Sequence, residues 1–141
     1  MDIGYALTPF AAWLVAGCVK FAVNTIRAGR LAFWLIGYGG LPSNHSAIVS
    51  SIATLIALRE GIGHPAFGVA VALAFIVTLD AVSLRGQVGK HAAAINRLVN
   101  DSPARGGALR ERIGHTKIEV LAGVVTGVVV GFWVFWVESR G

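Results

Sequence analysis

The positions of the charged residues constrain this chain more than any other feature of its sequence. Lys20 is the first basic residue, and no Lys or Arg lies between Arg59 and Arg85. Charged residues make up 13% of the chain, where a soluble domain usually carries about 25%. Long apolar stretches without basic residues are typical of membrane spans. The sequence therefore predicts an integral membrane protein, and its length predicts a single domain over residues 1–141.

Apolar segments predict the helices. Those that could cross a bilayer cover residues 3–26, 44–58, 66–82 and 117–137. Residues 87–99 space their apolar side chains as an amphipathic helix does, and we expect this helix near the interface. Residues 31–38 are apolar but too few to cross. We predict an all-α fold, a small polytopic helix bundle with about four transmembrane helices and one interfacial amphipathic helix.

A small-residue repeat marks the last predicted span. Gly123, Gly127 and Gly131 are spaced four residues apart, which lets two helices approach closely. Packing within the monomer and a homodimer through this face both fit the pattern.

The net charge of +5 suits nucleic acid, anionic lipid or a phosphate substrate. The high apolar content argues against nucleic acid. With four spans, the loops on one side would hold most of the basic residues, and those on the other side only Arg59 and Arg140. The positive-inside rule then predicts that the basic side faces the cytoplasm and that both termini lie outside.

Two polar groups lie in the first half of the chain. Lys20 and Arg27 are seven residues apart, about two helical turns, so both can face one phosphate; snorkelling to the interface is the alternative. The stretch 40–46 predicts a helix N-terminus, which favours an anion. Ser43 would add a hydroxyl or serve as a simple cap, and His45 would add a titratable donor or lie at the interface.

Two more polar groups lie in the second half. Asp80 and Arg85 suit an ion pair, with phosphate binding by Arg85 as the sharper alternative. His115 and Glu119 are four residues apart and can pair on a helix, which would leave one ring nitrogen free to attack. Thr116 and Glu119 alternatively fit a capping box, with His115 only a flanking residue.

These motifs resemble the type 2 phosphatidic acid phosphatase superfamily, which includes the vanadium-dependent haloperoxidases. That superfamily carries Lys-x6-Arg-Pro, Pro-Ser-Gly-His and Ser-Arg-x5-His-x3-Asp. The chain is most similar to a divergent branch of small membrane proteins, through residues 39–47, 80–85 and 114–120.

The resemblance implies His115 as the nucleophile, Glu119 as its orienting partner and His45 as the general acid. It implies Lys20, Arg27 and Ser43 as phosphate binders. The chain departs from the superfamily's pattern at four positions, where it carries Ala28, Asn44, Leu109 and Glu119. Leu109 stands where the third motif has Arg, and Arg85, Arg110 or Arg112 could supply that cation.

We therefore expect a metal-independent membrane phosphatase that acts on a lipid phosphate or diphosphate through a phosphohistidine intermediate. Its expected partners are membrane lipids and that substrate, without nucleic acid. We expect no cofactor, with vanadate as an inhibitor that mimics the transition state. The expected location is the bacterial cytoplasmic membrane, with the site on the cytoplasmic face. The alternative is a non-enzymatic protein that binds or moves anionic lipid phosphates.

Overall fold

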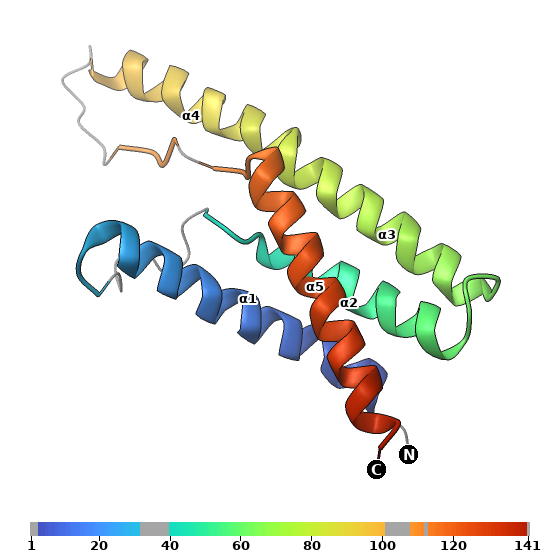
Figure 1. The fold of residues 1–141 in the computed structure, drawn as a ribbon. Helices are drawn as coiled ribbons and strands as arrows, with labels where there is room; N and C mark the ends of the chain where they lie inside the picture. The colour runs from blue at the N-terminus through green and yellow to red at the C-terminus, as the bar shows by residue number, and fades with distance from the viewer. Residues whose placement is uncertain (1–2, 32–39, 101–107, 112, 141) are drawn as a thin grey trace.

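The computed structural model describes residues 3–31, 40–100, 108–111 and 113–140 of the chain. Within these ranges it is all helical, which confirms the predicted all-α bundle (Figure 1). The helices are α1 (Gly4–Ala28), α2 (Asn44–Arg59), α3 (Pro65–Val82), α4 (Leu84–Asn100) and α5 (Lys117–Glu138). The apolar segment 31–38 lies almost wholly outside the described residues, as do residues 101–107.

Three stretches of the described chain are long and apolar enough to cross a membrane. They are Gly4–Ala28, Pro65–Val99 and Lys117–Glu138. The fourth predicted span is α2, whose 16 residues would extend only about 24 Å, less than a hydrocarbon core of about 30 Å. Because the side chains of Ala47 and Leu55 in α2 are fully buried, this helix packs inside the bundle rather than against lipid.

The glycine column of α5 packs against α2 of the same chain. A Cβ atom on Gly127 would lie 2.9 Å from the Ser51 nitrogen, and one on Gly131 would lie 2.7 Å from the Ser51 carbonyl oxygen. Gly123 meets the Ser43 carbonyl oxygen in the same way. Of the two arrangements that the spacing allowed, the structure therefore contains packing within the monomer. A homodimer through this face would have to displace α2.

Ser83 separates two helices that follow one another closely (Figure 1). The Ser83 backbone nitrogen donates to the Leu79 carbonyl oxygen at the end of α3. At the start of α3, Pro65 stands in the first turn, a position that proline suits. The following helix, α4, contains the predicted amphipathic segment 87–99 and begins three residues earlier. Its apolar side chains Leu84 and Leu98 are exposed. This pattern fits the predicted interfacial helix.

Both termini lie at one end of the bundle (Figure 1). A polar cluster joins three helices there: Arg59 of α2 forms an ion pair with Glu138 of α5, and its guanidinium lies 4.6 Å from the centre of the Tyr5 ring. The Tyr5 hydroxyl donates to Glu60 over 2.6 Å. The second polar cluster lies where α2 and α5 begin, so the chain gathers its polar groups at separate ends of its helices.

Candidate active site

The N-terminus of α2 is fixed by Ser43. Its hydroxyl oxygen accepts hydrogen bonds from the Ser46 backbone nitrogen (3.4 Å) and from the Ser46 hydroxyl (3.1 Å). Its backbone nitrogen donates to the Glu119 carbonyl oxygen over 2.9 Å. Ser43 is thus a fully buried cap that ties the start of α2 to the start of α5. His45 lies two residues further on, so the same contacts fix its position.

The N-terminus of α5 combines both arrangements that the sequence allowed for His115. Thr116 and Glu119 form a capping box: the Thr116 hydroxyl accepts from the Glu119 nitrogen, and the Glu119 carboxylate accepts from the Thr116 nitrogen over 2.8 Å. The same carboxylate oxygen, Oε2, lies 3.3 Å from His115 Nδ1. Glu119 therefore holds the helix end and the imidazole at once, and the two alternatives are compatible.

His115 is also held through its backbone, whose nitrogen donates to the Ala81 carbonyl oxygen of α3 over 3.0 Å. Its side chain is largely buried, with 6% of its surface exposed. The carboxylate beside Nδ1 favours the tautomer with its proton on Nδ1. That tautomer leaves the Nε2 lone pair of a neutral imidazole as the nucleophilic atom.

The pKa of His115 is lowered from its usual value of 6.5, chiefly because burial disfavours the imidazolium and also because the Lys20 charge repels it. The Glu119 carboxylate opposes this shift without reversing it. His115 is therefore neutral at pH 7, the state that a nucleophile requires.

His45 and Arg85 complete the polar centre. The rings of His45 and His115 lie 6.3 Å apart, centre to centre, with 58° between their planes. Arg85 Nη2 lies 3.4 Å from His45 Nε2, and Arg85 Nε donates to Asp80 Oδ2 over 3.1 Å. The predicted Asp80–Arg85 pair is thus present, and it places the guanidinium beside the predicted acid.

Lys20 reaches the same centre from α1. Its charge acts on both His45 and His115, and the charge of Glu119 acts on Lys20. Its side-chain stem also lies near Gly40, just before the Pro42–Ser43 turn. The centre therefore takes side chains from α1, α2, α3, α4 and the start of α5.

One predicted phosphate binder, Arg27, stands apart from this centre. Arg27 is exposed in the last turn of α1, about 10 Å beyond Lys20 along the helix axis. Among the described residues it has no hydrogen bond or ion pair with the centre. Arg112 lies outside the described residues.

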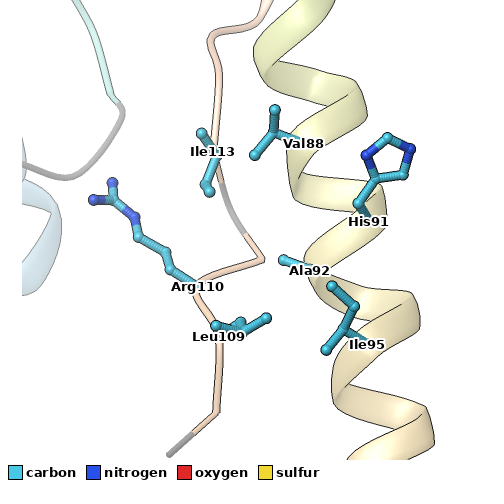
Figure 2. Close-up of a pocket in the computed structure, with 7 residues that line it drawn as sticks. All are labelled: Val88, His91, Ala92, Ile95, Leu109, Arg110 and Ile113. Carbon is cyan, nitrogen blue, oxygen red and sulfur yellow. The ribbon is translucent and has the colours of Figure 1, made fainter.

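Leu109, which stands where the superfamily's third motif has Arg, lies away from the polar centre. Leu109 lines a shallow apolar hollow of about 240 Å³ against α4, and the Arg110 side chain points away from that helix (Figure 2). The side chains around the hollow are Val88, His91, Ala92, Ile95, Leu109, Arg110 and Ile113. Among the arginines proposed to supply the missing cation, Arg85 contacts His45.

Asn96 is a positioning residue that the sequence analysis missed. Its side-chain amide donates to the Leu109 carbonyl oxygen and to Glu111, each over 2.8 Å, and its oxygen accepts from the Leu109 nitrogen over 2.7 Å. These bonds hold the segment before His115 against α4. The only signal for this role in the sequence was a polar residue beside the apolar face of the predicted helix 87–99.

The described residues contain no group of three or more His, Cys, Asp or Glu side chains placed to hold a metal ion. The chemistry available to this centre from its described side chains is that of two imidazoles, carboxylates and cations.

The chain matches a family model described as the Divergent PAP2 family over residues 4–130. It is 31% identical over 140 residues to the uncharacterized membrane protein YuiD of Bacillus subtilis (strain 168), covering 88% of this chain and 89% of that protein. No solved structure gives a significant match. With the family model covering most of the chain and including the motifs around Ser43, Asp80 and His115, the chain belongs to the Divergent PAP2 family.

Proposed function

We propose that this protein is a metal-independent phosphatase of a membrane lipid phosphate or diphosphate. The observation that carries the proposal is the pairing of His115 with Glu119 beside a second histidine and two cations. Phosphoryl transfer to a histidine needs a neutral imidazole, a group that orients it, an acid for the leaving group, and cations for the phosphoryl oxygens. The side chains of the described site are of the types that these roles need, which supports the proposal.

The first step forms a phosphohistidine. The Nε2 lone pair of His115 attacks phosphorus, the bond from phosphorus to the lipid oxygen breaks, and that oxygen takes a proton from His45. The released lipid is then an alcohol, or a monophosphate when the substrate is a diphosphate. Glu119 stabilises the positive charge that develops on the His115 ring through its contact with Nδ1.

The second step restores the enzyme. A water molecule attacks phosphorus, its proton passes to His45, and the bond between phosphorus and His115 Nε2 breaks. Inorganic phosphate leaves, and both histidines return to their starting states. Lys20 and Arg85 stabilise the charge on the phosphoryl oxygens in both steps, with Arg85 in the role of the superfamily's third-motif arginine.

A lipid substrate fits the position of the site better than a soluble ester. The centre lies where α5 begins, at one end of the stretch Lys117–Glu138 that is long enough to cross a membrane, and lipid headgroups are found at such ends. By the positive-inside rule, we place this end on the cytoplasmic face and both termini outside.

The test is phosphate release by the purified protein in mixed micelles with a panel of lipid phosphates. Phosphatidic acid, phosphatidylglycerol phosphate and polyprenyl diphosphate cover the main headgroups and tails. His115→Ala should reduce release to the background, and His91→Ala, an exposed histidine on α4, should match the wild type. Equal release by His115→Ala and the wild type would overturn the mechanism. Lipid phosphate binding without turnover by the wild type would instead support the non-enzymatic alternative.

A further inference from the structure

The contact between Arg85 and His45 favours a neutral His45 in the free protein. A guanidinium carries only donors, so Arg85 Nη2 can bond to His45 Nε2 only if that nitrogen presents a lone pair. His45 is then a neutral imidazole with its proton on Nδ1. The leaving-group acid, however, must carry a proton to donate.

The charges around His45 favour the same neutral state. Burial disfavours its imidazolium, and the charges of Arg85 from α4 and Lys20 from α1 do the same, while Asp80 of α3 is the carboxylate that opposes them. His115 also faces it, from the segment before α5, and is itself neutral at pH 7. A bound phosphate would reverse this balance, because it brings negative charge into the space between the cations.

The Arg85 side chain is held at its base and at Nε, so that its Nη2 end is the part with room to turn. Asp80 holds its Nε, and Gly114, whose φ of 106° suits glycine, packs closely on its stem: a Cβ there would lie 3.3 Å from Arg85 Cβ. The side chain is 37% exposed, so the Nη2 end has room to turn. Turning this end requires no movement of the stem or of the anchored Nε.

We propose that phosphate binding draws Arg85 Nη2 from His45 Nε2 to a phosphoryl oxygen, and that the freed Nε2 takes up one proton from solvent. Asp80 acts as the positioning residue for this exchange. The acid is thus charged only when a phosphate group is present. This inference rests on the proposed function, since it assigns the order in which phosphate binds to that site and His45 takes up its proton.

The experiment follows the histidine ring nitrogens by NMR in detergent micelles, using protein labelled with ¹⁵N-histidine. The chain has only four histidines, and a His45→Gln sample assigns the His45 signals. The probe is tungstate, a tetrahedral phosphate mimic that is a dianion at neutral pH; the samples are kept dilute, because concentrated tungstate condenses to polyanions in acid, and a tungstate blank is titrated beside them. Each sample is titrated with acid, with and without saturating tungstate.

In the wild type, tungstate should raise the pH midpoint of His45 protonation by about one unit or more, a tenfold or greater change in proton affinity. In Arg85→Gln without tungstate, the midpoint should already be higher than in the free wild type, and tungstate should raise it further by less. Arg85→Lys, which keeps the charge without the fork, should fall between them. Unchanged signals of His64 and His91, which lie outside the centre, show that the variants are folded.

The two proposals fail in different ways. Tungstate that binds the wild type, seen as a shift of the His115 signals, without moving the His45 midpoint would overturn the exchange and leave the phosphatase proposal standing. An equal midpoint in the free wild type and free Arg85→Gln would also overturn it. Absence of any tungstate binding together with absence of phosphate release would overturn the proposed function itself.

Discussion

Replacing Gly131 with Ala should destabilise the bundle by forcing α2 and α5 apart. The new Cβ would lie 2.7 Å from the Ser51 carbonyl oxygen and 2.8 Å from Thr54 Cβ. Restoring an ordinary contact of 3.4 Å requires the helices to separate by about 0.7 Å, because a backbone oxygen cannot turn aside. Overpacking of this kind costs about 1–3 kcal/mol. Part of that cost is offset by the better helix propensity of Ala, worth up to about 1 kcal/mol.

The matched control is Gly68→Ala in α3, where nothing lies within 4 Å of the added Cβ. That variant changes the propensity alone, so its unfolding midpoint should equal or slightly exceed that of the wild type. The assay is equilibrium unfolding in mixed micelles with rising SDS, followed by the fluorescence of the four tryptophans. A Gly131→Ala midpoint at or above the Gly68→Ala midpoint would refute the close packing of α5 on α2.

Three further predictions concern the active site. Glu119→Gln keeps a capping partner but removes the charge beside His115, and we expect kcat for phosphate release to fall about 10- to 100-fold, the equivalent of about 1.5–3 kcal/mol for a charged hydrogen bond. The Lys20 charge lowers the pKa of His115, so Lys20→Gln should raise that pKa and move the acid limb of kcat/KM to higher pH; an unmoved limb would contradict the assignment of His115 as the nucleophile. Asp80→Asn should lower kcat/KM through Arg85, so adding Asp80→Asn to Arg85→Gln should cost little more than Arg85→Gln alone, and full additivity would show that Asp80 acts independently.

The helices could be predicted from the sequence because their signals are local. The predicted segment 66–82 is observed as Pro65–Val82, and 117–137 as Lys117–Glu138. These boundaries follow from proline and cap residues next to apolar runs. The placement of α2 within the bundle was harder to predict from the sequence. The segment 44–58 predicted a helix, but only the tertiary structure shows that the glycine column of α5 faces it.

Only some of the contacts within the site could be predicted from the sequence. His115 and Glu119 are neighbours on one turn, so their contact followed from helical spacing. Arg85 and His45 are 40 residues apart, and no local rule chooses Arg85 over Arg110 or Arg112. The choice depends on how α4 leaves α3 at Ser83, which places residue 85 beside Asp80 and turned toward α2.

The glycine column also explains how a small bundle can hold its two histidines in register. His45 is two residues beyond Ser43, and Ser43 is bonded through its backbone to Glu119, the residue that orients His115. That bond requires α2 and α5 to approach at backbone distance, which Gly123 permits at this level, since any Cβ there would strike the Ser43 carbonyl oxygen. The repeat that resembles a dimerisation motif is thus part of the scaffold of the candidate site: its first glycine sets the distance between the proposed acid, His45, and the proposed nucleophile, His115, and its last sets stability at the far end.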